Sequence, residues 1–172
     1  MAEPTIVAEP GVPQIVLTTE LDAPRGLVFK AFTDPDLLAQ WLAPQRRNAK
    51  IDEYDPRPGG RWHFVHVDDD GAEHELRGVF HRTPSLRRGV VRTVESDGAP
   101  GRVALETTTF GERQGERTLL RQSLVCQSIE ARDDMLRDLR DEATDALVRL
   151  QELVERWAVR QVAQPGRPLQ AA

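Results

Sequence analysis

One long amphipathic segment near the end of the chain limits the fold more than any other feature. Between residues 130 and 157, apolar side chains recur at three- and four-residue steps, with Arg, Asp and Glu between them. This spacing predicts a single helix of about seven turns with one apolar stripe. The stripe needs a broad apolar surface to cover it, so the preceding residues must provide one. It consists of Met135, Leu136, Leu139, Ala143, Ala146, Leu147, Leu150, Leu153, Val154 and Trp157.

The residues before this segment predict an antiparallel sheet. Residues 14–21 (QIVLTTEL) alternate and are rich in β-branched side chains, as is typical of a strand. Two short helices follow, because Asp22-Ala23-Pro24 and Asp34-Pro35 each combine a capping side chain with a proline, and Pro44 closes the second helix. Six further strands are separated by short Gly-, Pro- and Asp-containing turns, which indicate antiparallel neighbours. These strands are 49–54, 60–67, 72–82, 90–95, 103–110 and 116–126.

One hairpin has a predictable register. If Asp69-Asp70-Gly71 is a three-residue loop with Gly71 in the left-handed conformation, His66 faces His74 across the hairpin. We expect the more apolar of the two resulting faces to look toward the long helix. That face carries Trp62, Phe64, His66, His74, Leu76, Gly78 and Phe80. The opposite face carries His63, Val65, Val67, Glu73, Glu75, Arg77 and His81.

Length and composition indicate one domain. We expect it to span residues 14–158 of the 172, with a disordered N-terminal tail at 1–13 and a flexible C-terminal tail at 159–172. Ser128 stands at the N-cap of the long helix, and Pro165 and Gly166 lie beyond its predicted end.

Charge and cysteine content narrow the environment and the partners. The formal charge of -5, with Arg mixed among Asp and Glu, argues against a nucleic-acid partner. The single cysteine excludes an intramolecular disulfide, and the chain has no secretory leader pattern and no apolar run of about 20 residues. We therefore expect a cytoplasmic protein with no membrane insertion.

Several short stretches, taken in order, resemble a known family. They are residues 22–24 (DAP), 28–35 (VFKAFTDP), 41–44 (WLAP), 55–62 (DPRPGGRW), 77–80 (RGVF), 121–122 (RQ) and 131–133 (ARD). With these, residues 14–157 resemble START-like (SRPBCC) superfamily members related to the activator of the heat-shock-protein-90 ATPase. The resemblance implies an α+β helix-grip fold. In that fold a curved antiparallel sheet of about seven strands surrounds a long C-terminal helix, with two short helices after the first strand.

In many relatives a cavity between the sheet and the helix holds a hydrophobic ligand, so the resemblance implies such a cavity here. The candidate lining residues are Trp41, Trp62, Phe64, His66, His74, Phe80, Gln122, Leu139 and Ala143. Relatives often carry a Gly-Trp pair where Glu142 and Ala143 stand, and an aromatic residue and Gly in place of Leu42 and Ala43. We expect extra space beside Ala143, bounded by Trp41 and by Phe64 or Phe80, unless neighbouring side chains collapse into it.

The four histidines all fall in the predicted hairpin, but their spacing does not favour a metal site. His63 and His66 are three residues apart on a strand and therefore point to opposite faces. His66 and His74 share a face, either as a plain polar pair or, at a cavity edge, with His66 as a general acid or base.

Other motifs for chemistry are weak, so catalytic residues stay unassigned and we expect no cofactor. Pro58-Gly59-Gly60 lacks the Lys and Ser or Thr of a phosphate-binding loop and predicts a tight turn. Glu106 and Arg121 lie on strands expected to be neighbours. Either one of them turns inward to hold a polar head group, or both are surface charges. Cys126 has no nearby His and is predicted to be a partly buried residue at a strand end.

Three functions remain open at this stage. The leading hypothesis is a binding module for a hydrophobic or amphipathic small molecule. The enzyme alternative, by resemblance to cyclase and aromatase members of the superfamily, uses the same cavity with His or Glu moving protons. The third is a co-chaperone that acts through its surface, and the alternative partners are a chaperone or a second copy of the chain.

Overall fold

The computed structural model describes residues 3–42, 48–67, 71–98 and 101–163. Its elements are β1 (Thr5–Val7), β2 (Gln14–Leu21), α1 (Arg25–Thr33), α2 (Pro35–Leu42), β3 (Asn48–Tyr54), β4 (Arg61–Val67), β5 (Glu73–Val79), β6 (Val90–Ser96), β7 (Val103–Arg113), β8 (Arg117–Val125) and α3 (Ile129–Ala163).

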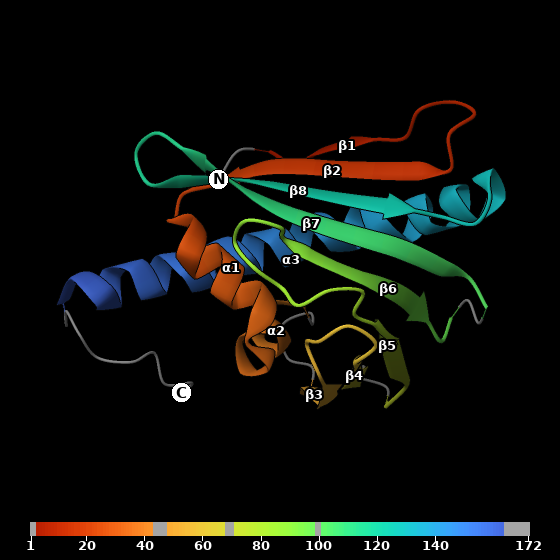
Figure 1. The fold of residues 1–172 in the computed structure, drawn as a ribbon, viewed down its shortest axis with the longest axis horizontal. Helices are drawn as coiled ribbons and strands as arrows, with labels where there is room; N and C mark the ends of the chain where they lie inside the picture. Colours follow the sequence, from red (N-terminus) through yellow and green to blue (C-terminus); the bar gives the residue numbers. More distant parts are fainter. Residues whose placement is uncertain (1–2, 43–47, 68–70, 99–100, 164–172) are drawn as a thin grey trace.

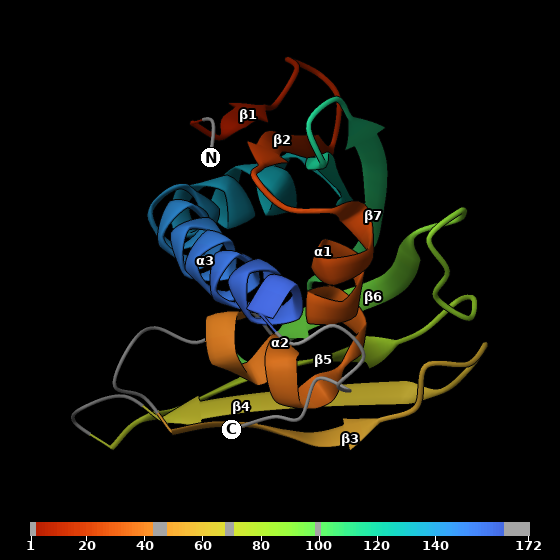
Figure 2. The ribbon, with the colours of Figure 1, turned by 90° about the vertical axis from the view of Figure 1, so that its left-hand side faces the viewer.

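The strands form one curved antiparallel sheet in the order β1-β2-β8-β7-β6-β5-β4-β3. The sheet bends around α3, so β2, β7 and β4 lie on three sides of the helix (Figures 1 and 2). α1 and α2 lie beside the C-terminal part of α3 (Figure 2). The predicted α+β helix-grip fold is confirmed, with eight strands where about seven were expected.

The register predicted for the β4–β5 hairpin is confirmed. His66 pairs with His74, Phe64 with Leu76 and Trp62 with Gly78. Gly71 has a φ of 86°, which an L side chain rarely adopts; the loop residues 68–70 lie outside the described residues. Trp62, Phe64 and Phe80 are fully buried on the face toward α3. On the opposite face, one residue differs from a solvent-exposed pattern: Val65 is buried. Its partners on the two neighbouring strands are Lys50 and Glu75.

The start signals of the helices have mixed outcomes. The Ser128 hydroxyl accepts a hydrogen bond from the backbone N–H of Ala131 (3.2 Å), and Asp34 accepts one from the N–H of Asp36 (3.2 Å), as expected for caps. α1 differs, because Pro24 itself occupies the N-cap position and no side chain caps the helix. Pro44, predicted to close α2, lies outside the described residues.

The predicted tails are partly structured. Thr5–Val7 pair with β2 within the segment expected to be disordered, and buried Arg132 donates hydrogen bonds to the carbonyls of Glu9 (2.7 Å) and Val12 (2.8 Å). These contacts offset the loss of chain entropy, which composition alone did not reveal. At the other end, α3 continues to Ala163, because no Pro or Gly interrupts residues 158–163. Among the described residues, no helix is long and apolar enough to cross a membrane.

The interior has two apolar clusters along α3. We call the larger one the packed end: it joins Leu147, Leu150, Leu153, Val154 and Trp157 to α1, α2 and the aromatic residues of the sheet. We call the smaller one the open end: Met135, Leu136 and Leu139 pack only partly buried against Ile15, Ala104, Leu124 and Cys126.

Candidate functional site

Two adjoining chambers lie between α3 and the concave face of the sheet. The inner chamber, of about 160 Å³, lies toward the packed end and contains Ala143 of α3 in its wall. The outer chamber, of about 270 Å³, lies at the open end near the start of α3. Both are lined by Leu76, Val94, Leu124 and Leu139, so the two spaces share one apolar wall.

A buried polar network forms part of the inner chamber. The Arg92 Nε donates a hydrogen bond to Glu106 Oε2 at 2.8 Å, while Glu106 Oε1 accepts from Thr108 Oγ1 at 3.0 Å and from Gln122 Nε2 at 3.1 Å. Arg92 and Glu106 are only 5% and 4% exposed. Trp62 covers the guanidinium, whose Cζ lies 4.0 Å from the ring centroid. The network therefore brings opposite charges into an otherwise apolar chamber in a neutralised form.

Strand alternation explains why these charges face inward. On β6, Arg92 lies between Val90 and Val94 and shares their face. β7 pairs in a register that sets Glu106 directly opposite Arg92. Composition alone does not reveal Arg92 as a cavity residue, because arginine side chains are rarely buried. Two features of the sequence could have identified it. The alternation of β6 places Arg92 on the face of Val90 and Val94, and the length of the β6–β7 connection sets the register that brings Glu106 opposite it.

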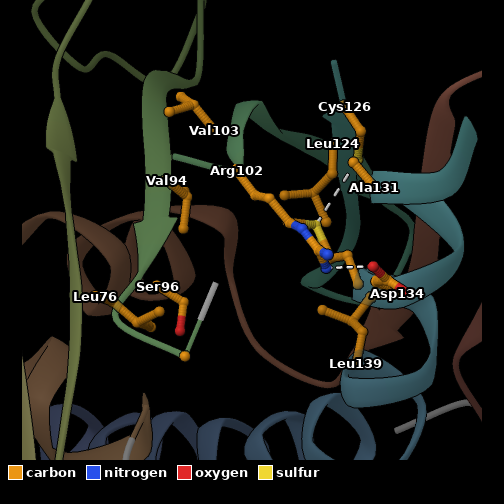
Figure 3. Close-up of a pocket in the computed structure, with 12 residues that line it drawn as sticks. Leu76, Val94, Ser96, Arg102, Val103, Leu124, Cys126, Ala131, Asp134 and Leu139 are labelled. Atoms are coloured by element: carbon orange, nitrogen blue, oxygen red, sulfur yellow. Dashed lines mark hydrogen bonds and ion pairs between the residues drawn. The ribbon is translucent and has the colours of Figure 1, made fainter. Parts of the chain in front are cut away.

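The outer chamber is mainly apolar, with one ion pair at its rim (Figure 3). Leu76 and Val94 approach it from the sheet on one side, and Leu139 approaches from α3 on the other (Figure 3). Cys126 lies next to Met135, with 3.9 Å between the two sulfur atoms. Burial raises the pKa of the Cys126 thiol, which keeps it protonated and weakly nucleophilic.

The structure brings together five of the nine candidate cavity residues. The inner chamber is lined by Trp41, Trp62, Gln122, Leu139 and Ala143, and the space expected beside Ala143 is present. Trp62 bounds this space in the position expected for Phe64 or Phe80.

The other four candidates lie elsewhere along the hairpin. Phe80 packs edge-on against Tyr54 with ring centroids 5.4 Å apart, and Phe64 is fully buried. His66 and His74 stack on each other with centroids 4.9 Å apart and belong to neither chamber. A shared strand face thus placed these residues on the correct side of the sheet without placing them at the cavity.

The remaining charged candidates lie on different faces of the sheet. Glu106 turns inward, whereas Arg121 is exposed and pairs in the ladder with Thr109. His63 lies on the outer face, with Nε2 3.2 Å from Glu75 Oε2 and Nδ1 3.8 Å from Asp52 Oδ2. Across the described ranges, no cluster of three or more His, Cys, Asp or Glu side chains is arranged to hold a metal ion.

Comparison with known proteins identifies a matching family and several similar folds. The family model of the Activator of Hsp90 ATPase homolog 1-like proteins matches residues 22–159. Protein Ms6760 from Mycobacterium smegmatis has a similar structure, with a TM-score of 0.77, 19% identity and coverage of 88% of this chain and 96% of that one. A search of the curated proteins found no match.

Two further solved structures are similar in the same way. A protein from Rhodobacter sphaeroides has a TM-score of 0.79 at 21% identity, covering 90% of this chain and 99% of its own. Protein CV1439 from Chromobacterium violaceum has a TM-score of 0.67 at 25% identity, covering 83% and 97%. At these identities the likeness shows the shared fold.

Proposed function

The chain belongs to the family of Activator of Hsp90 ATPase homolog 1-like proteins, and from this premise we propose that it binds an apolar or amphipathic small molecule between α3 and the sheet. The observation that carries the proposal is the pair of adjoining chambers with one shared apolar wall. Ligand pockets are typically apolar concavities of about 300 to 1,000 Å³ with a few polar groups. Taken together, the two chambers reach the lower part of that range.

The buried ion pair in the inner chamber supports binding more than a purely structural role. Burying a charged pair is costly, and apolar residues of similar size often serve stability equally well. Arg92 and Glu106 nevertheless occupy the chamber wall, where a donor and an acceptor would orient one polar group of an otherwise apolar molecule. The proposal therefore extends to amphipathic molecules.

The same network argues for binding over catalysis. Glu106 accepts hydrogen bonds from Arg92, Thr108 and Gln122, so both of its carboxylate oxygens are already engaged within the network. His66, the other candidate for proton transfer, stacks on His74 away from both chambers. Among the described side chains, the His that the cyclase-like alternative could use is thus absent from both chambers, and the Glu is held in the network.

Fluorescence of the neutral apolar probe N-phenyl-1-naphthylamine tests the proposal. We expect a saturable increase in its emission, accompanied by a rise in melting temperature that grows with probe concentration. Ala143→Trp narrows the inner chamber and Ala131→Trp the outer one, and each should weaken probe binding about tenfold, as expected when roughly 1.4 kcal/mol of apolar contact is lost.

Val148→Trp provides the matched control, because Val148 of α3 is exposed and lines neither chamber. It should leave probe affinity unchanged. A probe signal that is absent, or that is equally strong in all three tryptophan variants, would overturn the proposal. In that case, binding of a purified chaperone to the intact chain would support the co-chaperone alternative.

A further inference from the structure

A positively charged residue crosses the outer chamber, and the proposed function does not explain it. Arg102 comes directly before β7, and its side chain is half exposed. It reaches across the chamber toward α3, where it forms an ion pair with Asp134 (Figure 3). The residue thus places a guanidinium at the rim of a space whose walls are mainly apolar.

The carboxylate of Asp134 is shared between two arginines. Arg137, three residues further along α3, pairs with the same carboxylate as Arg102. Two guanidinium groups and one carboxylate leave this cluster with an excess positive charge. Both arginines are at least half exposed, and exposed ion pairs of this kind are weak and exchange readily. A second carboxylate can therefore join the cluster at little cost, because each guanidinium presents several donors in a planar fork.

The inner chamber has the opposite electrostatic character. Arg92 is already neutralised by Glu106, and both oxygens of Glu106 accept hydrogen bonds from neighbouring residues. An anionic group placed there would lie close to a buried carboxylate with no surplus positive charge to balance it. An anionic head group is therefore favoured at Arg102, with the apolar part of the molecule directed inward.

We propose, building on the function proposed above, that the ligands are apolar carboxylic acids bound in one orientation. The carboxylate pairs with Arg102 and Arg137 beside Asp134. The hydrocarbon part lies along the wall that the two chambers share, formed by Leu76, Val94, Leu124 and Leu139. Arg102 is then the residue that selects the charge of the head group.

Three probes with the same eight-carbon chain separate the head group from the tail. Octanoate, 1-octanol and octylammonium are each titrated against the full chain by calorimetry. Octanoate should bind about threefold to fivefold more tightly than 1-octanol, as expected for a carboxylate that pairs with half-exposed guanidinium groups. Octylammonium should bind more weakly than 1-octanol. Added salt should weaken the binding of octanoate and leave that of 1-octanol unchanged.

Two variants of the ion pair have opposite expected effects. Arg102→Gln should remove most of the preference for octanoate over 1-octanol without changing the affinity for 1-octanol. Asp134→Asn removes the competing carboxylate and should increase octanoate affinity about threefold, in line with the small energies of exposed pairs. A merely structural role of the ion pair would not produce an increase.

Arg121→Gln provides the matched control, because Arg121 is an exposed arginine on the outer face of the sheet. It should change neither affinity, and the melting temperatures of all three variants should stay close to that of the parent chain. If 1-octanol binds as tightly as octanoate, or if Arg102→Gln weakens both equally, this inference is overturned while the proposed function stands. If none of the three probes binds, the proposed function fails and this inference with it.

Discussion

The two ends of α3 meet the same sheet in different ways. At the packed end, Leu147, Leu150, Leu153 and Val154 are at most 2% exposed. α1 and α2 cover this end, and the ring of Phe32 lies 4.7 Å from that of Trp41 and 5.3 Å from that of Phe110. At the open end, Met135, Leu136 and Leu139 are half-buried, and Met135 and Leu139 border the outer chamber.

This difference divides one continuous helix into a close-packed part and a part that borders open space. A close-packed interior stabilises the fold but leaves no room for a ligand. An interior with open space loses dispersion contacts and gains the capacity to bind. In this chain α1 and α2 pack between the sheet and α3 at one end only, so most of the stabilising apolar contacts lie at that end. Site-directed variants can measure how sharp the division is.

The largest effect is expected at the buried ion pair, which lies between the two ends. Glu106→Gln leaves the guanidinium of Arg92 buried without a counter-charge, and we expect a loss of about 3 to 5 kcal/mol in the free energy of unfolding. Urea titration measures it. Glu20→Gln is the matched control, because Glu20 pairs with Arg117 at 3.0 Å on the surface and should cost less than about 1 kcal/mol. Equal losses in both variants would contradict the burial argument.

A direct comparison of the two ends comes from a pair of leucines. Leu150→Ala at the packed end should cost about 2 to 5 kcal/mol, because the surrounding side chains cannot close the resulting cavity. Leu139→Ala at the open end should cost about 1 kcal/mol, since Leu139 is half-buried and borders existing space. Chemical denaturation of both variants checks the difference. If the order were reversed, the division into packed and open ends would be wrong.

The only tyrosine in the chain reports on the packed end through its pH dependence. Burial raises the pKa of Tyr54 to about 12, and its ring packs against Phe80. The folded protein holds the phenol proton more tightly than the unfolded chain, so this contribution to stability is intact below pH 10. It is lost as the pH rises toward 12, and the loss is about 1.4 kcal/mol by pH 11.

Ultraviolet absorbance of the phenolate follows this titration without interference from another tyrosine. The native midpoint should lie near pH 12 and that of the urea-unfolded chain near pH 10. In Tyr54→Phe, the additional loss of stability between these pH values should be absent. A native midpoint at the ordinary value would mean that Tyr54 is open to solvent.

The smallest effect on stability is expected where side-chain volume is added beside existing space. Ala143→Trp should change the free energy of unfolding by less than about 1 kcal/mol, because the inner chamber accepts part of the new ring. In a close-packed core, the same substitution would cost about 1 to 3 kcal/mol through overpacking. A large loss of stability would therefore show that the inner chamber closes in solution.

Most of the fold was predictable because its signals are local and periodic. The apolar stripe of α3, the alternation of β2 and the glycine turn of the β4–β5 hairpin each determine a structure within a few neighbouring residues. The register of that hairpin followed from one loop length. The pairing of β1 was missed because this strand has only three residues, and Arg132, which holds the loop after it, lies more than a hundred residues away in the chain.

The site was less predictable, because a cavity forms where side chains from several elements fail to fill the interior, and no single stretch of sequence determines this. The hairpin face carried both the cavity residue Trp62 and the packed residues Phe64 and Phe80, and no local pattern separates them. Arg92 and Glu106 look like surface charges until their strands are aligned. Arg102 meets α3 only through the curvature of the sheet. Alignment of all the strands would have revealed that Arg92 and Glu106 face each other, but it would not have placed Arg102 beside α3.

The pairing of β2 with β8 has a consequence for how the chain folds during its synthesis. Gln14 pairs with Val125 and Leu21 with Thr118, so this seam, which lies one strand in from the β1 edge of the sheet, joins an early strand of the chain to the last one. During synthesis, β2 cannot pair until β8 (Arg117–Val125) has been made, and α3 (Ile129–Ala163) is made later still. Contacts so distant in sequence slow folding, and the apolar concave surface stays uncovered in the meantime. Docking of α3 onto the sheet thus completes the fold and also covers the apolar surface through which unfinished chains would aggregate.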